Sequence, residues 1–256
     1  MQWPRMAERV KMGKYIQLEE SDLDRPIYRF TTFARLIEFF RTGEFALAQT
    51  SKWDDPFENF IVGMRFKNNK GTLDLALRNA VHGSCWTRKS VSDALWRIYS
   101  PDKLSVRIGS TPRLLGTSLD CALAKYPRTK WFIGKVDYLP QKSIVNLASA
   151  LARLILQDES GTAAARSVLL KRRSFAHEDE VRILVIDRHR RSKGGVLKVK
   201  IDPHRVLRSV MIDSRAPREI LEMYRTHLKG QLGFRGRISK STLYDLPDRL
   251  VIQLGD

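Results

Sequence analysis

Residues 175–186 read FAHEDEVRILVI, and this stretch decides how the fold of the chain is interpreted. From residue 180 onwards it is rich in Val and Ile, which predicts a buried β-strand. Because side chains alternate faces along a strand, the prediction puts Glu178, Glu180 and Arg182 on one side. Two carboxylates this close shift each other's pKa or require cationic partners. The stretch therefore indicates either a chemical centre or a charged strand start paired with neighbouring arginines.

The composition is that of a globular protein. The chain has 256 residues, with 43% hydrophobic and 29% charged, which is enough for one large domain or two small ones. No apolar run reaches the roughly 20 residues of a membrane-spanning helix, and residues 1–22 lack the apolar core of a secretory signal. The two cysteines, Cys85 and Cys121, have no metal-ligand spacing around them. We expect free thiols in a reducing cytoplasm and no membrane contact.

The charge balance is strongly basic. Lys and Arg number 46 against 28 Asp and Glu, which gives a net charge of +18 and a pI near 10.2. Such a charge attracts polyanions, so we expect a nucleic acid as target or binding surface, although solubility or an acidic protein partner explains it equally well. The candidate nucleic-acid contacts are Arg172, Arg173, Arg188, Arg190, Arg191 and Lys193.

The hydrophobic pattern predicts a mixed α+β fold with mostly antiparallel sheets and flanking helices, without the regular alternation of a doubly wound sheet. The predicted strands cover residues 26–33, 45–49, 81–87, 104–109, 131–139, 180–186, 195–201, 206–212 and 250–254. The predicted helices cover residues 31–45, 72–80, 90–100, 143–157, 163–175 and 217–228.

The same pattern predicts how the chain is divided. Residues 1–25 form an irregular lead-in, residues 26–230 form one α+β domain of the catalytic type, and residues 231–256 form a tail that packs on it. No internal repeat or low-complexity tract interrupts this division.

Two motifs carry groups suited to ligand binding. In IYRF, Arg29 lies on a short strand between Tyr28 and Phe30, where a guanidinium can form paired hydrogen bonds with a phosphate or with a structural carboxylate. The helix SVSDALWRIYS places Trp96 and Tyr99 three residues apart on one face. They form an aromatic wall for a nicotinamide, a base or a sugar, or they pack in the core.

The turn KWDDPFENF gathers acidic and aromatic groups around a proline. The candidate residues are Trp53, Asp54, Asp55 and Glu58. Such a turn either contacts substrate or has a local role, in which an Asp caps the turn and the aromatic rings fill the core.

Several enzyme classes lack their signatures. The five histidines are scattered, and there is no H-x-x-x-H or C-x-x-C, so we expect no metal site. Neither a Walker loop nor a G-x-G-x-x-G occurs, and the nucleophile elbow G-x-S-x-G is also absent. The sequence therefore argues against P-loop NTPases, Rossmann dehydrogenases and α/β-hydrolases.

Taken in order, IYRF, WDDPFE, CWT with ALWRIYS, VDY and LLKRRSFAHEDEVRIL resemble a widespread uncharacterised bacterial family. That family has a Tyr-Arg start, an N-D-P-F-E turn, a short W-x-x-Y helix and a late Lys followed by E-x-E-x-R. The resemblance covers residues 26–230. This chain has Asp54 where the family has Asn, and CWT where a Phe-Ser pair is usual, which puts the role of Thr87 in question.

The layout also resembles, more distantly, the ADP-ribosyltransferase superfamily, and that resemblance implies an NAD-using enzyme. Arg29, with Tyr28 and Thr31 on the same predicted strand, would bind the NAD phosphates or ribose. Tyr99 or Trp96 would wall the nicotinamide. The remaining implied roles are Glu180 as the catalytic carboxylate, Glu178 as the accessory one, and Thr87 or Ser84 holding the catalytic carboxylate.

Three functions stay open at this point. The first is an ADP-ribosyltransferase-like enzyme that takes NAD as substrate and needs no metal. It would be a toxin or phage-defence effector with an antitoxin or defence-system partner, acting on nucleic acid or a nucleic-acid-associated target. The second is a catalytically inactive module of the same fold that binds a nucleotide or nucleic acid. The third is a magnesium-dependent nuclease built on the acidic residues.

Overall fold

The structure is a computed structural model that describes residues 13–68, 71–74, 77 and 79–246. Its strands are β1 Tyr15–Ile16, β2 Ile27–Thr31, β3 Glu44–Gln49, β4 Arg65–Asn68, β5 Gly71–Asp74, β6 Val81–Thr87, β7 Val106–Ser110, β8 Thr129–Lys135, β9 Asp137–Leu139, β10 Leu170–Arg172, β11 Glu180–Asp187, β12 Val196–Lys200, β13 Ser209–Ile212 and β14 Arg237–Lys240.

The α-helices are α2 Phe33–Thr42, α3 Asp93–Tyr99, α4 Pro112–Leu123, α5 Gln141–Gln157, α6 Thr162–Ser167, α7 Pro203–Val206 and α8 Arg218–Thr226. Shorter turns are the 3-10 helices η1 Glu20–Asp22, η2 Thr50–Lys52, η3 Pro56–Glu58 and η4 Arg173–Glu178, and the π-turn η5 His227–Gln231. No helix in the described part of the chain is long and apolar enough to cross a membrane.

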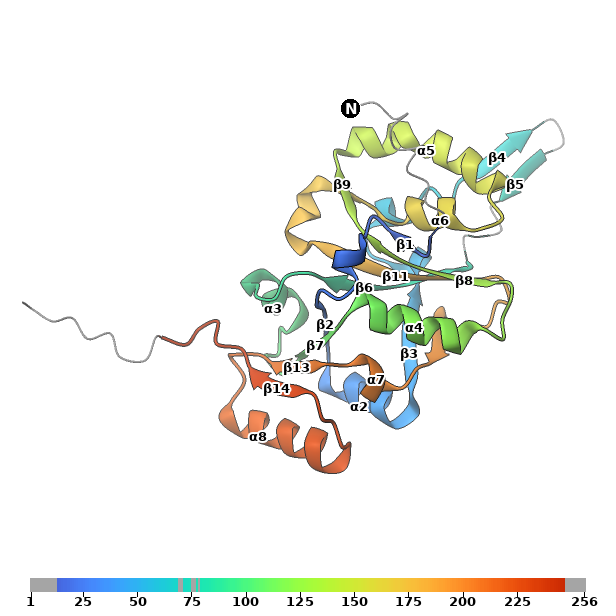
Figure 1. The fold of residues 1–256 in the computed structure, drawn as a ribbon. Coiled ribbons are helices and arrows are strands. Elements are labelled where there is room, and N and C mark those ends of the chain that lie inside the picture. Colours follow the sequence, from blue (N-terminus) through green and yellow to red (C-terminus); the bar gives the residue numbers. More distant parts are fainter. Residues whose placement is uncertain (1–12, 69–70, 75–76, 78, 247–256) are drawn as a thin grey trace, which may run out of the picture.

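Ten of these strands form one sheet in the order β1-β8-β11-β6-β2-β7-β13-β14, with β3 joined to β6 and β12 (Figure 1). Only the β1–β8 and β13–β14 pairs in this sheet are parallel, so the predicted mixed α+β fold with a mostly antiparallel sheet is confirmed. One hydrophobic core lies on the face covered by α2, α4, α7 and α8, and the other lies under α5 and α6 (Figure 1). The helices thus flank both faces of the sheet.

Local signals explain the best-predicted elements. The Thr32 side chain accepts a hydrogen bond from the backbone N–H of Arg35, which caps α2, and Gly43 ends this helix with a φ of 64°. Every residue of β11 is buried, as expected for a central strand rich in Val and Ile. Both elements lie next to the candidate site and fix its position.

Three predicted elements were wrong. Residues 131–139 form two strands, β8 and β9. The N–H of Val136 donates to the backbone carbonyl of Glu180, and the chain then leaves the main sheet. Residues 163–175 form only the short helix α6, and β10 then pairs in parallel with β9. Residues 71–74 form a strand where a helix was expected, and α4 and β14 were not predicted. The predicted strand 250–254 lies outside the described residues.

The two predicted flanks both contribute to the main sheet. β1, inside the predicted lead-in, pairs with β8, and β14, inside the predicted tail, pairs with β13. The division into lead-in, catalytic-type domain and tail stays a prediction.

Candidate active site

A cavity opens where the sheet splits beside β6. One edge of β6 pairs with β11 over its whole length, but the other edge pairs with β3 at His82 and Gly83 and with β2 at Thr87. The strands β2 and β3 therefore diverge from β6 between these points. A cavity of about 330 Å³ lies here, within the usual size of small-molecule sites. Its lining includes Tyr28, Arg29, Phe30, Arg35, Trp53, Ser84, Cys85, Thr87, Tyr99, Glu178 and Glu180.

One side of the cavity belongs to a buried charge cluster formed by Glu58, Lys171, Glu178, Glu180 and Arg182. Lys171 Nζ lies 2.6 Å from Glu178 Oε2 and 2.5 Å from Glu180 Oε1. Arg182 Nε donates to Glu180 Oε2 at 2.7 Å, and Arg182 Nη2 donates to Glu58 Oε1 at 2.8 Å. Both oxygens of Glu180 are thus held by cations.

The cluster shifts the pKa values of Glu178 and Glu180 in opposite directions. Burial raises the pKa of Glu180, but the charge of Arg182 and the neighbouring hydrogen bonds outweigh it and hold this pKa well below its ordinary value. Burial and a hydrogen bond to Glu180 raise the pKa of Glu178 to about 7, against the charge of Lys171. Two cations face three carboxylates, so the cluster is neutral when Glu178 carries a proton. Glu180 is therefore the ionised carboxylate, and Glu178 titrates near neutral pH.

Glu178 reaches the cluster by a route that differs from the predicted one. It ends the 3-10 helix η4 and does not lie on the strand, which begins at Glu180. Asp179 between them has a φ of 44°, in the left-handed region that Asp tolerates better than most residues. This turn, and not strand alternation, brings the two carboxylates together.

Thr87 fixes that turn and does not hold a carboxylate. Its hydroxyl donates to the backbone carbonyl of Glu178 at 2.5 Å. The same oxygen accepts from the backbone N–H of Lys89 at 3.0 Å. The Ser84 hydroxyl accepts from the indole N–H of Trp86 at 3.1 Å. Among these hydroxyls, Thr87 has the closer link to the candidate catalytic residues, through the backbone.

Trp53 covers the cluster from the turn that follows β3. Its ring lies 4.7 Å from the guanidinium carbon of Arg182, a cation–π contact that shields the buried cation. The ring passes so close to β6 that a Cβ on Gly83 would lie 2.6 Å from it. Glycine is required at this point of the strand because any side chain would displace the tryptophan.

The other side of the cavity holds an arginine pair, Arg29 and Arg35. No hydrogen bond or ion pair joins either side chain to another group in the part of the chain that the structure describes. Burial lowers the pKa of Arg29, and the Arg35 charge lowers it further. A guanidinium that is desolvated without a carboxylate is an anion-binding group.

The arginine pair also borders a second cavity of about 320 Å³ between α2, β3 and β12. Arg29, Arg35 and Ala48 line both cavities. The second cavity adds the apolar side chains of Phe39 and Phe45. The pair therefore stands at the junction of two neighbouring hollows.

The aromatic candidates divide between cavity and core. Tyr99 lines the cavity with 47% of its surface exposed and stacks on Phe30 with ring centroids 5.8 Å apart. Trp96 is 1% exposed and packs edge-on against Phe30 at 4.8 Å. Trp96 therefore supports the wall from the core, and Tyr99 forms its surface.

Some of the predicted site residues lie elsewhere. Thr31 lines the second cavity and pairs with Val106 in the sheet. Asp54 is exposed outside the cavity. Asp55 accepts from the backbone N–H of Phe57 and forms an ion pair with Arg172 at 3.1 Å. Of the acidic turn, only Glu58 joins the cluster.

The predicted nucleic-acid contacts are partly engaged within the protein. Besides Arg172, Arg191 pairs with the buried Asp187 at 3.1 Å, and Arg188 donates to a backbone carbonyl. Arg173, Arg190 and Lys193 are exposed. The loop that carries residues 188–193 follows the far end of β11, so at about 3.3 Å per residue it lies roughly 23 Å from Glu180.

Within the described ranges, no group of three or more His, Cys, Asp and Glu side chains is placed to hold a metal ion. The three clustered glutamates instead surround Lys171 and Arg182, whose charges occupy the place a divalent cation would need.

Sequence reasoning missed three residues that build this site. Lys171 falls inside the helix predicted over residues 163–175, although a late Lys before E-x-E-x-R belongs to the family pattern. Strand alternation puts Arg182 on the correct face as a possible partner of Glu180, but it does not predict the buried link to Glu58. Gly83 has no signal in a single sequence, because its role depends on a tryptophan thirty residues earlier.

No protein-family model matches the sequence, and no curated protein matches it. Among solved structures, Thermus sp. 2.9 DarT in complex with NAD+ aligns with 85% of this chain and 96% of its own, at 13% identity and a TM-score of 0.38. The same protein in complex with carba-NAD+ aligns with 88% of this chain and 97% of its own, at 14% identity and a TM-score of 0.39. In complex with ADP-ribosylated ssDNA it aligns with 85% of this chain and 94% of its own, at 13% identity and a TM-score of 0.39. At these identities and TM-scores the similarity carries no argument about this chain.

Proposed function

We propose that this protein is an ADP-ribosyltransferase-like enzyme that takes NAD as substrate and transfers its ADP-ribose to an acceptor. One observation carries the proposal. Two arginines without an ion-pair partner among the described residues, Arg29 and Arg35, line the same cavity as two carboxylates whose pKa values are shifted in opposite directions, Glu178 and Glu180. NAD has a pyrophosphate for the cations and a glycosidic bond for the carboxylates. The order of the motifs along the chain, which resembles the ADP-ribosyltransferase superfamily, supports the same proposal.

Glu180 is the carboxylate that acts on the glycosidic bond. Cleavage of that bond passes through an oxocarbenium-like state, as in glycoside hydrolysis. A carboxylate that stays ionised stabilises the positive charge that develops on the ribose. Lys171 and Arg182 fix the orientation of Glu180, and each of its oxygens retains a lone pair for a ribose hydroxyl.

Glu178 handles the proton of the acceptor. A group whose pKa is raised to about 7 is half deprotonated at neutral pH, which suits a general base. It lies beside Glu180 on the same lysine, so the acceptor approaches next to the carboxylate that stabilises the ribose. Thr87 positions Glu178 through its backbone.

Arg29 and Arg35 bind the phosphates, and the rings of Tyr99 and Trp53 border the nicotinamide. Tyr28 lines the same cavity beside Arg29. Direct contact with NAD is not part of the proposal for Thr31 and Trp96, which lie outside this cavity. The acceptor class is nucleic acid or a nucleic-acid-bound protein, as the net charge of +18 favours. The proposal includes a biological role for the enzyme as a toxin or phage-defence effector, with an antitoxin or another defence protein as its partner.

The test is release of nicotinamide from labelled NAD, with transfer of label to added nucleic acid or protein. Glu180→Gln keeps the shape of the site but removes the carboxylate charge. We expect its rate to fall at least about 100-fold, as when one preorganised transition-state group is lost. Asp54→Asn, an exposed carboxylate outside the cavity, should leave the rate unchanged. Absence of label transfer and of nicotinamide release in the wild type, or equal rates in wild type and Glu180→Gln, would sink the proposal.

One observation favours a second candidate, the catalytically inactive binding module. Glu180 is only 4% exposed and both its oxygens already bind cations. Binding of NAD without release of nicotinamide would support this alternative. We do not propose the magnesium-dependent nuclease, because the cluster carboxylates are neutralised by Lys171 and Arg182.

A further inference from the structure

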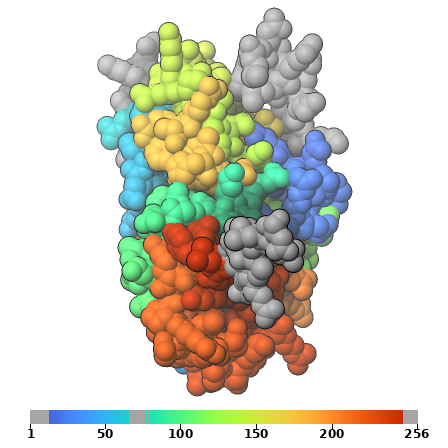
Figure 2. Space-filling view, turned by 90° about the vertical axis from the view of Figure 1, so that its left-hand side faces the viewer, coloured from blue at the N-terminus to red at the C-terminus, as the bar shows by residue number. Residues whose placement is uncertain are grey.

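The C-terminal basic segment, which we define as residues 203–240, carries a disproportionate share of the charge. It holds nine Lys and Arg against three Asp and Glu, in 38 of the 256 residues. It forms the orange and red end of the molecule in Figures 1 and 2, away from the helices α5 and α6. A third of the net charge of +18 is therefore concentrated at one end.

Most of these cations have no partner among the residues that the structure describes. Arg205, Arg215 and Arg225 form ion pairs with neighbouring carboxylates. The other six side chains make no hydrogen bond or ion pair within the described residues. These six are Arg208, Arg218, Lys229, Arg235, Arg237 and Lys240. Their charges are free to bind an external anion.

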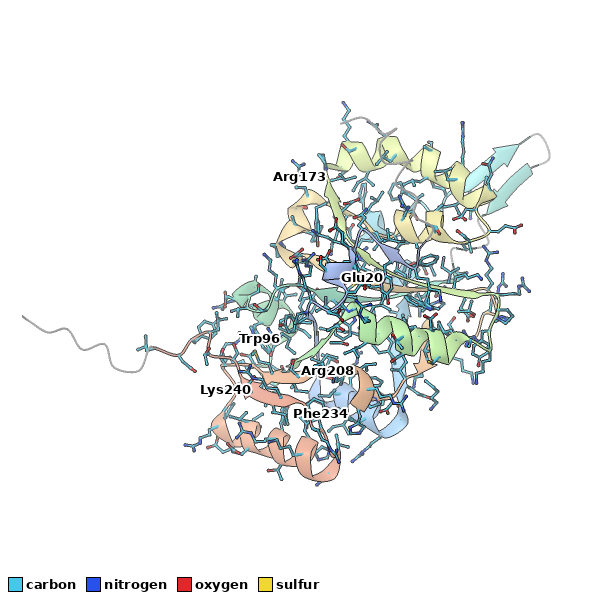
Figure 3. All side chains as sticks on the ribbon, in the orientation of Figure 1. Glu20, Trp96, Arg173, Arg208, Phe234 and Lys240 are labelled. Carbon is cyan, nitrogen blue, oxygen red and sulfur yellow. The ribbon has the colours of Figure 1, made fainter. Side chains whose placement is uncertain are left out.

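Two of the six line one hollow, and a third lies next to them in the chain's fold. A cavity of about 580 Å³ is lined by Arg208 and Arg235 together with His204 and Phe234, and none of its described lining residues is acidic. The backbone N–H of Arg237 donates to the carbonyl of Arg208 at 3.0 Å, which holds this third arginine next to the others. Figure 3 shows Arg208, Phe234 and Lys240 at this end of the molecule, far from Arg173.

The register of the sheet connects this end to the candidate active site. Residues that face each other across successive strands form one row on one sheet face: Glu180, Thr87, Tyr28, Gly109, Ser209 and Arg237. Five strand spacings of about 4.8 Å separate the ends of the row, or about 24 Å. A polymer bound at Arg237 must therefore span about 24 Å to reach Glu180.

A second unpaired cation lies on the same face between the two ends. Arg107 is 5% exposed, and its Nε and Nη1 atoms have no hydrogen-bond partner in the described part of the chain. Its guanidinium lies 4.0 Å from the ring centroid of Tyr28. A buried guanidinium with free donors costs stability unless a ligand satisfies it. An arginine on an aromatic ring is also a common contact for bases and phosphates of single strands.

We propose that the C-terminal basic segment binds the phosphodiester backbone of a nucleic acid, with Arg208, Arg235 and Arg237 as its main contacts. Arg107, which is buried, and Tyr28 lie between this segment and the cavity. The proposal concerns binding and does not depend on the reaction at Glu180. It places the main contact on a different surface from the loop at residues 188–193, where Arg191 is already paired.

The experiment measures the affinity of the full chain for fluorescent single-stranded and duplex oligonucleotides, without NAD, between about 50 and 200 mM salt. The test variant is the triple Arg208→Gln, Arg235→Gln, Arg237→Gln. The control triple is Lys125→Gln, Arg128→Gln, Lys130→Gln, which removes the same charge from exposed positions elsewhere. Thermal unfolding of each variant checks the fold.

We expect the test triple to raise Kd at least about tenfold and to lower the salt slope by about 2 to 3, since each lost phosphate contact removes 0.7 to 0.9. The control triple should change Kd less than about threefold. Equal loss in both triples, or no binding by the wild type at low salt, would overturn the proposal. Competition by poly-glutamate as strong as by an oligonucleotide of equal charge would instead assign the surface to an acidic protein.

Discussion

The buried charge cluster and the arginine pair border the same cavity, but only the charges of the cluster are neutralised by partners among the described residues. In the cluster, Lys171 and Arg182 are both held between glutamates. In the pair, neither Arg29 nor Arg35 has a hydrogen bond or ion pair within the described residues. The difference separates two tasks: paired charges fix the geometry of catalytic groups, and unpaired charges are left for a ligand.

The largest effect expected from this comparison is on stability. Lys171→Met leaves Glu178 and Glu180 buried without their shared cation, and breaking a buried pair costs about 3–5 kcal/mol. The free energy of unfolding from urea titration should fall by about that amount. Arg29→Met, on the other side of the cavity, is the control and should change it by less than about 1 kcal/mol, because no internal partner is lost. Similar losses in the two variants would contradict the comparison.

The next effect is on pH dependence. With the pKa of Glu178 raised to about 7, the general base is protonated below that pH, so the rate of nicotinamide release should fall about tenfold for each pH unit below 7. The Glu178→Gln variant should release nicotinamide slowly, and its rate should not show this fall below pH 7. A pH profile that is identical in the two proteins would remove Glu178 from the reaction.

The same group makes a signed prediction for stability. A carboxyl whose folded pKa lies above its ordinary 4.5 stabilises the fold below about pH 4.5, and that contribution is lost as the pH rises through about 7. The unfolding free energy of the wild type should therefore decline more between pH 5 and 8 than that of Glu178→Gln. Parallel curves would mean that Glu178 ionises normally.

The smallest effect concerns Arg107, an unpaired cation outside the cavity. Removing unsatisfied buried donors favours folding by about 1–3 kcal/mol, and losing the contact with Tyr28 opposes it by about 0.5–2 kcal/mol. Arg107→Met should therefore change the free energy of unfolding by between about −1 and +2.5 kcal/mol, while weakening nucleic-acid binding. A clear loss of stability would show that Arg107 has a structural role.

The sequence predicts the parts of the site that depend on local signals. The strand at β11 follows from its run of Val and Ile, and α2 follows from its cap at Thr32 and its end at Gly43. Both carboxylates and Arg29 were named as candidates because their order along the chain resembles a known superfamily. Local patterns were sufficient because each of these elements is set by its own residues.

The rest depends on contacts between distant segments. The run AAARSVLLKRR looks helical, but β10 forms because Leu170, Lys171 and Arg172 pair with β9. That pairing buries Lys171 between the glutamates, which no periodicity predicts. The unpaired state of Arg29 is equally invisible, since it requires knowing that no carboxylate approaches from another strand.

Titration of NAD into the wild type, Arg29→Met and the control Arg128→Met tests the central claim most directly. Arg128 is an exposed arginine outside the cavity, so its variant should bind NAD like the wild type. Loss of a hydrogen bond to a charged group costs about 1.5–3 kcal/mol, so the Kd of Arg29→Met should rise at least about tenfold. Equal affinity in all three proteins, or no binding of NAD by the wild type, would contradict the claim that the unpaired arginines hold the substrate.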